Sequence, residues 1–186
     1  MRILVFTEGT LIMHRGAAGL QREQIVKQVI EDKDPSLHDW KSYIPIGHAS
    51  HKLDLWRNQG AEIFYLTSRT KPTDIESISH VLKKHGFPTG QLLYRKDRQQ
   101  YKDIAEKTTP DIIIEDDCES IGGENQMTYT HVRYELRGRI RLVKVKEFEG
   151  IEEKREKIKS EKHDVDSKLD VLKTEREKYS AELNSM

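Results

Sequence analysis

The sequence predicts an α/β protein with a doubly wound parallel sheet, and two patterns along the chain predict it. Apolar residues form short continuous runs at 3–6, 63–66 and 112–114. Such runs are typical of strands that are buried on both faces of a parallel sheet. Segments in which apolar residues recur at helical spacing separate the runs. Alternation of strands and helices indicates parallel pairing through helical crossovers.

The individual elements follow in an order that fits this fold. Further strands are expected at 92–94 and 140–145, and helices at 49–56, 75–82 and 101–105. The middle helix carries Thr73 and Glu76 at the spacing of a capping box, directly after Pro72. Gly86 is placed to end this helix.

A long stretch separates the first strand from the next firm helix. It contains Leu20, Ile25, Val26, Val29 and Ile30 at helical spacing, followed by a polar turn. A single crossover does not need so much chain. We therefore expect residues 15–45 to form a small insert or cap near the carboxyl ends of the strands, where open α/β sheets bind ligands.

Residues 151–186 have a different composition from residues 1–150. They hold 19 charged side chains in 36 residues and no Gly or Pro. Apolar residues recur every seven positions from Ile151 to Met186, but Arg155, Lys162 and Arg176 stand at companion positions four residues on. We expect a charged C-terminal helix that packs on the rest of the chain, forms a weak coiled coil with a second copy or binds a protein partner, or is mostly solvated.

Composition limits the classes of partner. The 32 basic residues balance 32 acidic ones, so charge gives no case for a nucleic-acid or anionic-membrane partner. The longest apolar runs have four to six residues, far below the roughly 20 that span a bilayer. The single cysteine, Cys118, excludes an internal disulfide and is expected as a packed thiol, because adjacent carboxylates disfavour its thiolate. A cytoplasmic protein is the expectation.

Polar side chains follow the predicted strands in a fixed order. The segments are Phe6-Thr7-Glu8-Gly9-Thr10-Leu11, Leu66-Thr67-Ser68-Arg69, Lys102 fifteen residues before Asp117, and Ile114-Glu115-Asp116-Asp117. The first resembles the Asp-x-Asp-Gly-Thr-Leu signature of the haloacid dehalogenase (HAD) superfamily, and the others resemble the second, third and fourth motifs of that family. This resemblance over residues 1–150 implies a HAD-like, Rossmannoid sheet with a minimal cap.

The resemblance also implies a chemistry. In the family, an aspartate attacks phosphorus, an acid two residues later protonates the leaving group, and Mg²⁺ neutralises the phosphoryl oxygens. The matching residues here are Glu8, Thr67 and Lys102 as catalytic groups, Thr67, Ser68, Arg69 and Lys102 as phosphate ligands, and Glu8, Asp116 and Asp117 as ligands of Mg²⁺. Alternative roles are a helix N-cap for Thr67, cover of the sheet edge for Arg69, and Lys96 in place of Lys102.

The chain departs from the family at the nucleophile. Because Gly9-Thr10 fix the alignment, Phe6 stands at the position of the attacking aspartate and Glu8 at that of the acid. A phenyl ring has no lone pair for attack and no oxygen for a metal ion, which excludes ordinary aspartyl-phosphate catalysis. Glu8 then either acts as an acid or base for a metal-bound water, or is a residue of a backbone turn in a site that no longer catalyses a reaction.

Two hypotheses about function follow. The first is a phosphohydrolase-related protein, catalytically impaired or repurposed, that binds Mg²⁺ weakly together with a small phosphorylated molecule. If active, it would be a Mg²⁺-dependent phosphoester hydrolase with a non-standard mechanism. The second is a non-catalytic pseudoenzyme that acts as a protein-interaction module through residues 151–186.

Overall fold

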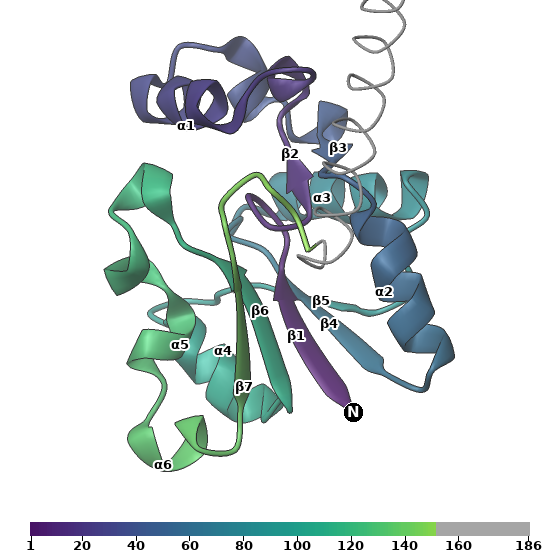
Figure 1. The fold of residues 1–186 in the computed structure, drawn as a ribbon, viewed down its shortest axis with the longest axis vertical. Coiled ribbons are helices and arrows are strands. Elements are labelled where there is room, and N and C mark those ends of the chain that lie inside the picture. The colour runs from purple at the N-terminus through teal and green to yellow at the C-terminus, as the bar shows by residue number, and fades with distance from the viewer. Residues whose placement is uncertain (152–186) are drawn as a thin grey trace, which may run out of the picture. The chain divides into compact units, whose positions relative to one another are not determined.

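Five parallel strands form the central sheet of the computed structural model, which describes residues 1–151. The strands are β1 (Arg2–Phe6), β4 (Glu62–Leu66), β5 (Gln91–Leu93), β6 (Ile112–Asp116) and β7 (Arg141–Val145). Their order in the sheet is β5-β4-β1-β6-β7, with every pairing parallel (Figure 1). The predicted α/β class is confirmed.

Helices pack on both faces of the sheet. They are α2 (Ala49–Asn58), α3 (Pro72–Lys84), α4 (Tyr101–Thr108), α5 (Thr128–His131) and α6 (Tyr134–Arg137). Leu53 of α2 shares an apolar cluster with Ile3 of β1, whereas Ile104 of α4 shares the opposite cluster with Leu4. Neighbouring residues of β1 thus enter different cores. This two-sided burial is why the strand reads as a continuous apolar run.

The start of α3 differs from the predicted capping box. Pro72 is the first helical residue, Lys71 is the N-cap without a capping side chain, and the Thr73 hydroxyl donates to Asp74 at 3.2 Å. Proline favours the first helical position because its missing N–H has no intrahelical partner there. Thr73 is therefore already inside the first turn, and its predicted capping role is wrong.

Residues between β1 and α2 form an insert at the carboxyl ends of the strands (Figure 1). The short strands β2 (Ile12–Met13) and β3 (Ile44–Pro45) pair antiparallel within it. It also contains α1 (Arg22–Glu31) and 3₁₀ helices at Arg15–Ala17, Pro35–His38 and Trp40–Ser42. Most of these elements lie within residues 15–45, the segment expected as a cap, and β2 lies just before it.

Within residues 1–151, no helix combines the length and the apolarity needed to cross a membrane. The predicted charged C-terminal helix and coiled coil fall on residues 152–186, outside the described residues. That helix and the boundary at Gly150 stay predictions.

Candidate functional site

The register of the sheet brings three strand ends to one level. Phe6 of β1 lies opposite Leu66 of β4, and Val5 lies opposite Ile114 of β6. The chain passes from β1 to β4 and β5 on one side and returns to β6 on the other. Such a switch point is where open α/β sheets bind ligands. The residues that follow these strands therefore share one edge.

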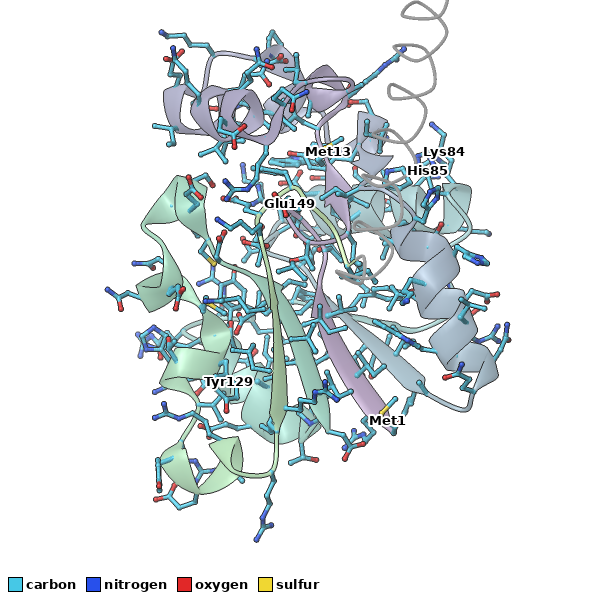
Figure 2. All side chains as sticks on the ribbon, in the orientation of Figure 1. Met1, Met13, Lys84, His85, Tyr129 and Glu149 are labelled. Atoms are coloured by element: carbon cyan, nitrogen blue, oxygen red, sulfur yellow. The ribbon has the colours of Figure 1, made fainter. Side chains whose placement is uncertain are left out.

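A cavity of about 300 Å³ lies at this edge, beneath the insert. Met13, labelled in Figure 2, lies in its lining. Its walls come from separate parts of the chain and include Phe6, His14, Trp40, Arg69, Tyr101 and Glu147. Residues of both the strand ends and the insert thus line the cavity.

An aromatic pair occupies the end of β1. The rings of Phe6 and Tyr101 meet edge to face, with centroids 5.5 Å apart and an interplanar angle of 73°. The Arg95 guanidinium carbon lies 4.2 Å from the centroid of the Tyr101 ring. Burial raises the pKa of the Tyr101 phenol, and the charge of Arg95 acts in the opposite direction. The position expected for a nucleophile therefore carries an apolar ring held by a second ring.

The carboxylate of Glu8 is a centre of hydrogen bonding. Its Oε1 accepts from the Thr67 hydroxyl at 2.6 Å, and its Oε2 accepts from the Thr7 hydroxyl at 2.6 Å and the Ser68 N–H at 3.2 Å. Arg69 Nε lies 3.4 Å from Oε1, and the Glu8 side chain is 15% exposed. Glu8 therefore faces the residues that follow β4.

Three other carboxylates gather after β6 and β7. Asp116, Asp117 and Glu147 each offer an oxygen, and these oxygens lie within 4.8 Å of one another. Burial raises the pKa of both Asp116 and Glu147, and neighbouring carboxylates raise both further. Carboxylate oxygens are ligands that Mg²⁺ prefers. The donor set therefore fits a hard divalent cation.

Short contacts hold this acidic cluster (Asp116, Asp117 and Glu147) in place. The Thr10 hydroxyl donates to Asp116 at 2.7 Å, and the N–H and hydroxyl of Ser120 donate to Glu147 at 2.7 and 2.6 Å. Gly9 adopts a φ of 80°, and a Cβ on it would lie 2.9 Å from an Asp116 oxygen. Only glycine fits both the backbone conformation and this close approach.

Arg22 of α1 joins the insert to the acidic cluster. Its Nε donates to the Glu147 carbonyl at 2.9 Å, and a terminal nitrogen lies 3.6 Å from Asp117 Oδ1. The same nitrogen donates to the carboxylate of Glu119. The side chain of Arg22 is 11% exposed. A single, partly exposed guanidinium thus links α1 to the segments after β6 and β7.

Glu115 is a buried carboxylate at the end of β6. It accepts the N–H groups of Thr128 and Tyr129 at 2.7 and 2.8 Å. Burial raises its pKa to about 7, against the opposing effect of these hydrogen bonds. Glu115 thus fixes the start of α5 beside the cavity.

His14 carries an imidazole nitrogen with no partner among the described residues. Ser36 Oγ donates to the Asp34 carboxylate at 2.7 Å and accepts from the Gly16 N–H at 3.0 Å. Its one proton is therefore used, so His14 Nδ1, 2.9 Å from Ser36 Oγ, must be the donor there. The buried Nε2 of the neutral ring is then a bare acceptor.

The structure brings most of the predicted residues together. Glu8, Ser68, Arg69 and Asp116 line the cavity, Thr67 binds Glu8, and Asp117 belongs to the acidic cluster. Two placements differ from those implied by the resemblance. Lys102 is not in the cavity lining, and its charge acts on Glu106, one helical turn along α4. Glu147 joins the two aspartates where Glu8 was expected.

Several residues of the site carried no signal in the sequence. They are His14, Arg22, Trp40, Tyr101 and Glu147. Arg22, Trp40 and Glu147 lie outside the motif segments, and His14 and Tyr101 lie near motif segments without belonging to them. Glu147 has a weak clue, since it follows a strand that ends beside β6. The Cys118 thiol has a pKa raised by burial and by the carboxylates of Asp116, Glu115 and Glu147, as expected of a packed thiol.

No family model matches the chain, and no curated protein matches it. Solved structures do. The class C acid phosphatase from Bacillus anthracis superimposes with a TM-score of 0.50 at 12% identity, covering 77% of this chain and 65% of that one. A chain of the Pnkp1/Rnl/Hen1 RNA repair complex gives 0.48 at 15% identity, covering 78% of this chain and 43% of that one. The chain thus shares an α/β fold with this acid phosphatase. It spans less than two thirds of the length of these proteins.

Proposed function

We propose that the chain is a HAD-like domain that has lost aspartyl-phosphate catalysis and retains a divalent cation site. Three of the four segments that resemble motifs of that family follow β1, β4 and β6 of its α/β fold, and the fourth, Lys102, lies in the first turn of α4. One observation carries the proposal. Phe6, at the position of the attacking aspartate, packs edge-on against Tyr101 with centroids 5.5 Å apart.

The packing of Phe6 argues against a hydrolase in which another residue simply replaces the nucleophile. A phenyl ring held by Tyr101 places apolar surface where a phosphoryl oxygen and a metal ligand would otherwise lie. Glu8 is the carboxylate nearest in sequence, but both of its oxygens accept hydrogen bonds from hydroxyl or backbone donors. These contacts hold the Glu8 carboxylate against Thr7 and the residues that follow β4.

Asp116, Asp117 and Glu147 would hold Mg²⁺ in this proposal. The cation would neutralise buried carboxylates and provide a positive charge for an anionic ligand. The set lacks the ligand that an aspartate at position 6 would provide. We therefore expect weak binding, with a Kd on the order of millimolar.

Calorimetric titration with Mg²⁺, paired with an assay of aryl phosphate hydrolysis, tests the proposal. The wild-type chain should bind Mg²⁺ with millimolar affinity and release no detectable phenolate. Asp116→Asn combined with Glu147→Gln should abolish the binding heat. Asp97→Asn, which neutralises an exposed loop carboxylate, is the matched control and should change nothing. Micromolar binding that survives the double substitution, or rapid Mg²⁺-dependent hydrolysis by the wild-type chain, would overturn the proposal.

A further inference from the structure

We infer that Thr67, Ser68 and Arg69 form an oxyanion-binding site whose resident ligand is the chain's own Glu8 carboxylate, so that the wild-type site takes up no free phosphate. The inference rests on the proposed function and deepens it, because it names what fills the position at which a phosphorylated ligand was expected.

The first step is the set of donors around Glu8. Two hydroxyls and one backbone N–H donate to the two carboxylate oxygens, Thr7 and Thr67 at 2.6 Å and Ser68 N–H at 3.2 Å. The charged guanidinium of Arg69 lies beside them, with Nε 3.4 Å from Oε1. Charge-assisted contacts of this kind are among the stronger hydrogen bonds in proteins. A carboxylate and a phosphate present the same kind of acceptor oxygen to such donors.

The second step is that contacts other than those with Glu8 fix two of these groups, the Thr67 hydroxyl and the Arg69 guanidinium. The Arg69 N–H donates to the Thr67 hydroxyl oxygen at 3.2 Å, and Arg69 Nε donates to the Ser68 hydroxyl at 3.0 Å. The guanidinium carbon of Arg69 also lies 4.1 Å from the centroid of the Trp40 ring. The donors are therefore preorganised, and removing Glu8 leaves a site rather than a collapsed loop.

The third step concerns access and charge. Glu8, Ser68 and Arg69 line the 300 Å³ cavity, so an anion that replaced Glu8 would arrive through existing space. While Glu8 stays in place, an entering phosphate meets its negative charge in a site that is only 15% exposed, as well as that of buried Asp116. Like charges at short distance disfavour binding strongly when solvent screening is low. Glu8 thus both fills the site and repels a competitor.

The test is calorimetric titration with inorganic phosphate in the presence of a chelator, which separates this inference from the cation site. Glu8→Ala should bind phosphate at least about tenfold more tightly than the wild-type chain, a factor that corresponds to ~1.4 kcal/mol. In phosphate-free buffer its melting temperature should lie below that of the wild-type chain. Phosphate should raise it, because a ligand of the native state stabilises that state. Adding Thr67→Val should remove the gained affinity.

Two control variants test whether any gain in phosphate affinity comes from removing the Glu8 side chain from the site or only from removing a negative charge. Glu8→Gln removes the charge but keeps the site filled, and Asp32→Asn removes a charge elsewhere in the same cavity lining. Neither should gain the affinity of Glu8→Ala. Equal gains in all three variants, or equal phosphate binding by wild type and Glu8→Ala, would overturn the inference. If Glu8→Ala does not fold, Glu8→Ser keeps a short hydroxyl at the turn and is held to the same criterion. Failure of the inference would leave Mg²⁺ binding and the absence of hydrolysis unaffected.

Discussion

Three residues of the cavity lining make contacts that also determine what chemistry their side chains can perform. They are Phe6, Glu8 and His14. The ring of Phe6 packs against Tyr101 and, in the proposed function, stands where a nucleophile would be needed. Glu8 accepts hydrogen bonds from the donors after β4, which we infer to be an anion site. His14 satisfies Ser36 through Nδ1 and leaves Nε2 as an acceptor in a buried place.

His14 should remain neutral, as the Nδ1–H tautomer, across the neutral pH range. Burial lowers its pKa below the ordinary 6.5, and the charge of Asp34 only partly opposes this. Because the unfolded chain then binds the proton more tightly, the stability contributed by His14 is present above pH 6.5 and decreases as the pH falls below it. Long-range ¹⁵N–¹H NMR spectra of the ring should show one protonated nitrogen, Nδ1.

Ser36→Ala provides the control for the tautomer. It removes the acceptor of Nδ1, so the two neutral tautomers should mix in the variant. An Nε2–H tautomer in the wild-type chain, or a titration midpoint above 6.5 for His14, would contradict the hydrogen-bond assignment.

At the scale of elements, Arg22 should hold α1 against the strand ends. Hydrogen bonds to charged groups contribute about 1.5–3 kcal/mol when buried, and Arg22 is 11% exposed. In Arg22→Met, amide hydrogen exchange in α1 should therefore accelerate by about tenfold or more. Lys27→Ala, which removes only an exposed pair with Glu31 on the same helix, should leave exchange nearly unchanged. Equal exchange rates in the two variants would show that Arg22 does not hold the insert.

The helices and strands of this fold can be predicted from the sequence better than the contacts between them. The runs at 3–6, 63–66 and 112–114 predict β1, β4 and β6, because burial on both faces requires apolar residues at successive positions. The gap in the pattern after the first strand predicts an insert. Thr73 shows the limit at an element's end, since Pro72 sets the first turn in place of the expected cap.

Only those residues of the candidate site that belong to a recognisable motif could be predicted from the sequence. Glu8, Ser68, Arg69 and Asp116 follow apolar strands in recognisable order, and they do line one cavity. Arg22 and Glu147 lie in segments without a local pattern, and their contact depends on how the insert meets the end of β7. Lys102 shows that a motif match does not guarantee a place at the site. Its position in the sequence fits the family, but its side chain lies outside the cavity lining. Side-chain direction on a helix is set by packing, which spacing alone does not specify.

At the scale of the whole molecule, residues 1–151 should fold without the residues that follow. Their contacts form one compact unit, and Ile151 is buried in a core cluster with Ile3 and Leu53. A chain ending at Ile151 should melt cooperatively, within about 4 °C of the full chain, which corresponds to ~1 kcal/mol for a domain of this size. Loss of the cooperative transition in differential scanning calorimetry would show that residues 152–186 belong to the core.

The central claim is that the Phe6 ring and the Glu8 carboxylate occupy the nucleophile and phosphate positions of a phosphohydrolase site. Substitutions that restore both positions test it most directly. Phe6→Asp restores the nucleophile, and Glu8→Asp shortens the side chain that occupies the Thr67 and Ser68 donors. Because Phe6→Asp removes apolar burial of about 1.5–3 kcal/mol, circular dichroism must first show that the variants fold. Phe6→Asn with Glu8→Asp is the matched control, since it has the same shape without a nucleophilic oxygen at position 6.

The decisive measurement is the rate of Mg²⁺-dependent aryl phosphate hydrolysis by the folded double variant Phe6→Asp, Glu8→Asp. The account predicts a rate at least about 10²-fold above that of the wild-type chain and of the Asn control. It also predicts that Phe6→Asp alone stays near the wild-type rate, because Glu8 still fills the anion site. Hydrolysis by the wild-type chain that Glu8→Gln abolishes, or equal activity of the Asn control and the double variant, would contradict it.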